Sequence, residues 1–136
     1  MLESRLDGST VLISPQAMTN SATVTANLDT QGAAHATIRI AFAAEVNTNA
    51  IGPTISLLES DDTVVTNFAT VTADRTAEDI TSAKVVQYDV DLRGRKKYLR
   101  LSVTTETTTN DNVTLSAVAT KSRQGESGGT DVLVNV

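Results

Sequence analysis

The chain contains no cysteine, and this absence excludes several classes of small protein. Without thiols there is no disulfide framework of the kind that stabilises small secreted domains, no thiolate metal site and no cysteine nucleophile. Histidine occurs once, at His35, with no acidic or histidine partner nearby in the sequence. A metal triad or a Ser-His-Asp relay needs several groups in one constellation. We therefore expect no metal, no cofactor and no enzymatic activity.

Aromatic residues are also scarce, at 3% of 136 residues, although apolar residues make up 40%. The core must then be built from Val, Ile, Leu and Ala, which bury less area per residue than Phe or Trp. A chain of 14.3 kDa forms one domain and buries about two-thirds of its unfolded surface. We expect further apolar area to be buried between subunits, in a homo-oligomer that is a dimer or a trimer.

No apolar run approaches the length that spans a bilayer, and the N-terminal residues 1–7 lack the apolar region of a signal peptide. We expect a protein made in the cytoplasm that does not enter a membrane. The net charge of −5 argues against nucleic acid as a partner.

Thr and Val are abundant, and apolar and polar residues alternate through most of the chain, the period of half-buried antiparallel strands. The segments with this pattern are 22–28, 36–43, 54–59, 63–68, 84–92, 98–104 and 113–120. Residues 70–83 are the only candidate helix, with a long loop as the alternative. About eight or nine short strands predict an all-β fold, an antiparallel β-sandwich. The long connections 45–53 and 71–83 suit Greek-key crossings and favour a jelly roll over an immunoglobulin-like sandwich.

The chain divides into three parts. Residues 1–20 are expected to form an N-terminal arm with a short strand, Thr10–Ser14, stopped by Pro15. Residues 21–120 form the sandwich, and residues 121–136 form a Gly- and Ser-containing linker and a C-terminal strand. That strand is predicted to join a sheet edge in its own sandwich or a neighbour's. The apolar residues expected to make the oligomer contact are Val132, Leu133, Val134 and Val136.

The strongest charge asymmetry is a basic turn, which we define as residues 93–97 together with Arg100. It holds five of the eleven basic side chains, namely Arg93, Arg95, Lys96, Lys97 and Arg100. Clustered arginine grips carboxylates well, so one interpretation is a contact with an acidic protein surface or with phosphates. The other is a solvated hairpin turn that protects an edge. Single-stranded nucleic acid would need aromatic stacking platforms, and only Tyr88 and Tyr98 are near.

The acidic side chains are expected to form turns or solvent-facing positions rather than sites. Asp61, Asp62 and the loop 109–112 are typical turn formers without the spacing of a calcium loop. Asp89 and Asp91 share one face of a strand with Gln87, and we expect all three to mark its solvent side.

The passage from Tyr88 to Thr104, in which Leu-Arg-Gly-Arg is followed by a strand opening Tyr98-Leu99, resembles the jelly-roll cement or decoration proteins of tailed-bacteriophage capsids. The resemblance implies a non-enzymatic homo-oligomer on the virion exterior that binds the major capsid protein and stabilises the shell. The alternative is a tail- or fibre-associated β-domain that binds a host-surface carbohydrate. Copy number per particle separates the two.

Overall fold

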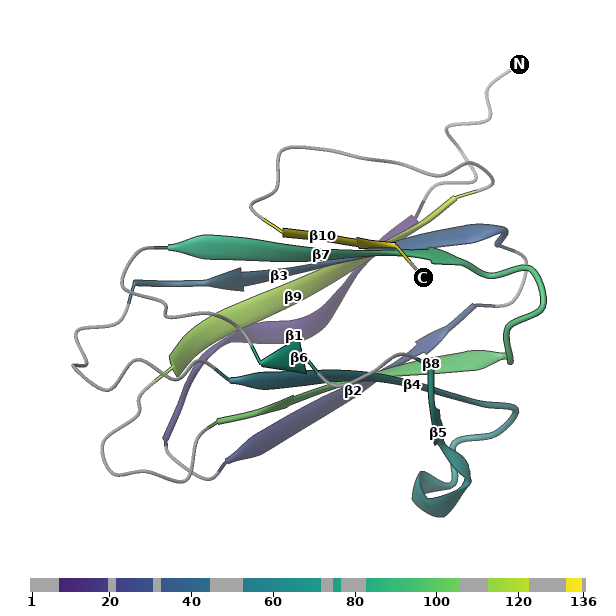
Figure 1. Ribbon diagram of the computed structural model, residues 1–136, viewed down its shortest axis with the longest axis horizontal. Coiled ribbons are helices and arrows are strands. Elements are labelled where there is room, and N and C mark those ends of the chain that lie inside the picture. Colours follow the sequence, from purple (N-terminus) through teal and green to yellow (C-terminus); the bar gives the residue numbers. More distant parts are fainter. Residues whose placement is uncertain are drawn as a thin grey trace.

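The computed structural model of the protein describes residues 8–19, 22–30, 33–44, 53–71, 75–76, 83–105, 113–122 and 132–135. These residues form two β-sheets packed face to face, so the predicted all-β sandwich is confirmed (Figure 1). Sheet A has the order β1 (Gly8–Met18), β9 (Val113–Ser122), β3 (His35–Phe42), β7 (Lys84–Asp91) and β10 (Val132–Asn135). Sheet B has the order β2 (Thr23–Asp29), β8 (Tyr98–Thr104), β4 (Thr54–Ser60) and β5 (Ala69–Thr70), and β6 (Arg75–Thr76) pairs with the other end of β4.

The strands pair in a regular way along the chain. β1 pairs with β9, β2 with β8, β3 with β7, and β4 with β5 and β6, all antiparallel. The early strands therefore pair with the later strands in reverse order. Two further antiparallel pairs, β3 with β9 and β4 with β8, join these strand pairs into the two sheets.

The core lies between the sheets and comes from the alternation seen in the sequence. In β3 the inward residues Ile38 and Ile40 have no exposed surface, and in β8 Leu99, Leu101 and Val103 are at most 1% exposed. Because successive side chains point to opposite faces, each strand contributes one apolar row. Among the described residues, the buried aromatic side chains are Phe42 and Tyr88 alone, so aliphatic residues supply most of the buried area.

The first strand differs from its expected length. It was expected to stop at Pro15, and this is wrong, because β1 continues to Met18. Its register with β9 shifts between Val11 and Ile13 and again between Ile13 and Gln16. β1 is an edge strand, where proline is tolerated and an irregular register absorbs the missing N–H. Part of the expected arm is thus a strand of the sandwich.

A second correction concerns residues 63–68, which were expected to be a strand. Val65–Asn67 form a 3-10 turn instead, η2. Asp62 Oδ1 accepts the N–H of Val64 at 2.9 Å, and Asp62 Oδ2 accepts Asn67 Nδ2 at 2.9 Å. These bonds close the chain locally and lower the pKa of Asp62, the backbone bond most strongly. Within the expected helix or loop at 70–83, the described residues include Thr70, which ends β5, and the short strand β6.

The C-terminal strand was expected to join a sheet edge, and this is confirmed. β10 pairs in parallel with β7 of its own sandwich, from Val132 opposite Val86 to Asn135 opposite Asp89. Val136 lies outside the described residues, and the oligomer contact of this tail stays a prediction. Over the described ranges, no helix has the length and apolar character that crossing a membrane requires.

Candidate protein-contact surface

The basic turn joins the two layers of the sandwich. It leaves β7 in sheet A and enters β8 in sheet B, so these strands are not paired and the expected hairpin is not formed. On the sheet A side, Leu92 is buried and donates its N–H to the Ala34 carbonyl at 2.8 Å. Arg95 N–H then closes a turn onto the Leu92 carbonyl at 3.0 Å. Gly94 has φ +84°, a conformation that side chains disfavour, so glycine is required at this position.

Thr30 anchors the other end of the turn. Its N–H donates to the Lys97 carbonyl at 2.9 Å, and its hydroxyl donates to the carbonyls of Lys97 at 2.7 Å and Lys96 at 3.2 Å. Thr30 itself is buried. The backbone of the basic turn is therefore tied to the body of the sandwich at both ends, and its side chains project from a fixed frame.

Two of the arginines already have carboxylate partners. Arg93 binds Asp91 through Nε to Oδ1 at 2.9 Å and Nη2 to Oδ2 at 2.8 Å, although the side chains are 73% and 43% exposed. These bonds hold the pKa of Asp91 well below its usual range and raise that of Arg93. Arg95 Nη1 lies 3.8 Å from Glu59 Oε1, and Glu59 Oε2 accepts the Lys96 N–H at 3.2 Å. The charge of each guanidinium group is thus partly neutralised by a carboxylate of the same chain.

Arg100 lies apart from the rest of the basic turn, on the outer face of sheet B. Its Nε donates to Asn27 Oδ1 at 2.9 Å, and its guanidinium carbon lies 4.4 Å from the ring centroid of Phe68. Arg100 therefore interacts with an amide and an aromatic ring on this outer face. The sequence placed it with the turn because it is only three residues further on.

The two lysines of the basic turn face solvent, as does Arg93, but Arg93 has a carboxylate partner. Lys96 and Lys97 are both exposed, and the Lys97 Nζ lies 5.1 Å from the ring centroid of Tyr98. Of the five predicted contact residues, the structure brings Arg93, Arg95, Lys96 and Lys97 together at one end of the sandwich. A partner carboxylate would meet the ammonium groups first, because the guanidinium groups have acids of their own.

A polar cluster on the outer face of sheet A was not anticipated from the sequence. Arg39 Nε donates to Gln87 Oε1 at 2.8 Å, and Gln87 Nε2 donates to Asp89 Oδ1 at 3.3 Å. Thr37 Oγ1 donates to the same Asp89 oxygen at 2.9 Å. Gln87 is fully buried, so the expectation that it is exposed to solvent is wrong, although it shares the outward face of β7 with the half-buried Asp89 and Asp91. β3 pairs with β7 and sets Arg39 opposite Gln87, a relationship that the alternation alone does not reveal.

His35 does gain an acidic neighbour in the fold. It starts β3 and lies opposite Asp91 of β7 and Ser122 of β9. A coulombic interaction with His35 makes the smallest contribution to the lowered pKa of Asp91. Within the described ranges, no group of three or more His, Cys, Asp or Glu side chains is arranged to hold a metal ion.

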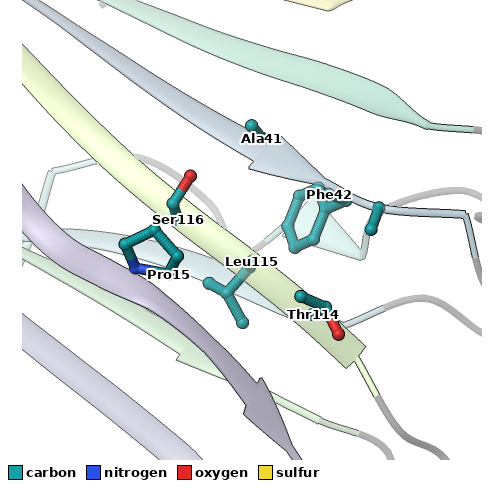
Figure 2. A pocket seen from close by; sticks show the side chains of 7 residues that line it. Pro15, Ala41, Phe42, Thr114, Leu115 and Ser116 are labelled. Atoms are coloured by element: carbon teal, nitrogen blue, oxygen red, sulfur yellow. The ribbon is translucent and has the colours of Figure 1, made fainter.

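A shallow depression of about 270 Å³ lies at one end of sheet A. Pro15 of β1, Ala41 and Phe42 of β3 and residues 114–116 of β9 line it (Figure 2). Its polar side chains are the hydroxyls of Thr114 and Ser116, and none of the lining residues is ionisable. Among the described residues that line it, the depression therefore brings together neither an acid–base pair nor an activated nucleophile.

No protein-family model matches this chain, and no curated protein matches it in sequence.

Proposed function

We propose that this protein is a structural virion component that binds the outer surface of a phage capsid and stabilises the shell, and that its sandwich is a jelly roll. The observation that carries the proposal is the strand pairing, in which β1, β2, β3 and β4 pair with β9, β8, β7 and β5. One long antiparallel hairpin rolled into two sheets has this pairing. Jelly rolls built of two Greek keys recur in viral capsid proteins and in lectins.

The basic turn supplies the contact with the major capsid protein in this proposal. Its backbone is tied by Leu92 and Thr30, so Lys96 and Lys97 are presented at a fixed place on one end of the sandwich. Exposed ion pairs contribute only about 1 kcal/mol or less each. Repetition of the contact over the shell multiplies it, and binding to the assembled shell alone stabilises that shell by mass action.

The test is binding to particles that lack this protein. Purified protein is added to such capsids, bound copies are counted by quantitative gel analysis, and the particles are heated with and without it. We expect saturable binding at symmetry-related positions, visible by cryo-electron microscopy, and a higher temperature of shell disruption.

Two results would contradict the proposal. One is a failure to bind intact shells at low salt. The other is localisation of native protein to a few copies at the tail, which would favour the tail- or fibre-associated domain that binds a host carbohydrate.

A further inference from the structure

Among the described edge strands β2 is the least protected, although Lys121 Nζ donates to the carbonyl of Asp29 at its end at 3.1 Å. It has seven residues, Thr23–Asp29, and an unbroken register with β8. Its sequence, TVTANLD, contains neither proline nor lysine, the residues that usually guard an edge. The other described edges differ, because β1 contains Pro15 and two register shifts, β5 and β6 have two residues each, and β10 has four.

The hydrogen bonds that flank β2 show which backbone groups point away from the sheet. Thr105 N–H donates to the Ala22 carbonyl at 2.9 Å before the strand, and Thr30 N–H donates to the Lys97 carbonyl at 2.9 Å after it. In an antiparallel pair, the residues that bond to the neighbour alternate along the strand. The even-numbered residues of β2 therefore bond to β8, and the N–H and C=O groups of Thr23, Thr25 and Asn27 point outward.

The side of the sandwich next to this edge is incompletely closed. β1 and β2 are the edge strands of their sheets and approach each other on the same side (Figure 1). The inward residues Val24 and Ala26 of β2 are only half buried, as is Leu12 of β1, although all three pack against the core. By contrast, Leu101 and Ile55 on the central strands of sheet B are fully buried. A partner that extended sheet B would cover both the outward backbone groups and this apolar seam.

We propose that β2 pairs with β2 of a second copy of this chain, antiparallel and about a two-fold axis at Ala26. This register sets Val24 opposite Leu28, Thr25 opposite Asn27 and Ala26 opposite itself. Apolar residues then face apolar residues on the inner side, and polar residues face polar residues on the outer side, as cross-strand pairing requires. The small side chain of Ala26 suits the close approach of a non-hydrogen-bonded pair on the axis.

Charge and hydrogen bonding agree with the same register. Asp29 is the one charged residue of β2, and it lies opposite Thr23 of the other copy, so the two carboxylates are at opposite ends of the interface. Thr25 and Asn27 both direct backbone groups outward, and as a facing pair they exchange two N–H···O bonds on each side of the axis. The same patch on both copies makes the interface isologous and closes it at a dimer. The inference is independent of the capsid proposal.

Sedimentation velocity of the full chain tests the inference at micromolar concentration. We expect a species of twice the 14.3 kDa chain mass. Thr25→Pro removes an outward N–H and leaves the bonds to β8 intact, since proline is tolerated on an edge strand. We expect it to raise the dimer dissociation constant by about tenfold or more, because two hydrogen bonds are lost per dimer. Thr25→Val, which keeps the N–H, is the matched control and should leave the constant unchanged.

A crosslinking experiment keeps the inference testable even if Thr25→Pro does not fold. The chain has no cysteine, so Ala26→Cys introduces a single thiol on the proposed axis, within disulfide reach of its counterpart. Mild oxidation should give a covalent dimer much faster than for Thr63→Cys, an exposed position in the segment after β4. A monomeric wild-type protein, an unchanged constant for folded Thr25→Pro, or equal crosslinking of the two cysteine variants would overturn the pairing.

Discussion

Arg93 binds Asp91 through two parallel hydrogen bonds, Nε to Oδ1 at 2.9 Å and Nη2 to Oδ2 at 2.8 Å, at the end of β7, where the chain leaves sheet A. The N–H of Arg93 donates to the same carboxylate at 3.1 Å. Asp91 therefore holds the backbone at the start of the basic turn. It also binds the guanidinium group that the sequence analysis predicted to contact a partner. The basic turn is consequently less uniform in charge than its sequence suggests.

The first prediction concerns the pKa of Asp91. Arg93→Gln removes the side-chain bonds and should raise this pKa toward its ordinary value of 3.8, while the backbone bond keeps it somewhat below. Because the pKa is lowered in the folded protein, the pair stabilises the fold above the unfolded pKa, and this stabilisation is lost as the pH falls toward the folded value. Carboxyl-detected NMR titration of both proteins measures the shift. An unchanged pKa in Arg93→Gln would show that the pair does not form in solution.

The second prediction separates the lysines of the basic turn from its arginines. Lys96→Ser combined with Lys97→Ser should weaken capsid binding at low salt, and the difference from wild type should shrink as salt rises. Arg93→Ser removes one charge, so it is compared with Lys97→Ser alone, and it should weaken binding less than that variant because Asp91 already binds the guanidinium of Arg93. Melting temperature should stay near the wild-type value in all three, since exposed pairs contribute about 1 kcal/mol or less to folding. Equal losses in the lysine and arginine variants would assign the contact to the whole turn.

The third prediction concerns Gln87, the buried amide on the outer face of sheet A. Gln87→Ala leaves Arg39 Nε without its acceptor and should lower the free energy of unfolding by roughly 1–3 kcal/mol. Gln87→Glu keeps an acceptor for Arg39 but places a second carboxylate beside Asp89, so its stability should rise as the pH falls and that repulsion is relieved. Urea unfolding at several pH values measures both effects. A stability loss no larger than that of an exposed Thr114→Ala control would contradict the role of Gln87.

The fourth prediction concerns the C-terminal strand. Deleting residues 131–136 exposes the edge of β7 and should lower the melting temperature, because four residues of parallel pairing are lost. Hydrogen exchange in the intact protein should show protected amides within Val132–Asn135. The truncated chain should remain a dimer, since β2 belongs to the other sheet. A monomeric truncation product would instead indicate that the tail is exchanged between copies.

The sequence by itself determined the elements and their faces. Alternation at period two places Ile38, Ile40, Leu99 and Leu101 in the core, because a strand has only two faces and one of them must be apolar to be buried. The same reasoning identified the C-terminal strand at 132–135. The prediction from alternation was wrong at Asp62, where a short-range hydrogen bond competes with strand formation. It was also wrong at Pro15, where an edge strand tolerates a proline.

Only the tertiary structure decided which side chains meet. Glu59 and Lys96 are 37 residues apart and share a hydrogen bond because β4 and β8 are neighbours in sheet B. Gln87 accepts a hydrogen bond from Arg39 because β3 pairs with β7 in a register that sets the two residues opposite each other. β7 and β8 look like a hairpin in the sequence, yet they lie in different sheets, so the basic turn crosses between layers. Periodicity specifies the face of a strand, but the pairing of strands depends on the packing of the whole core, which no local segment encodes.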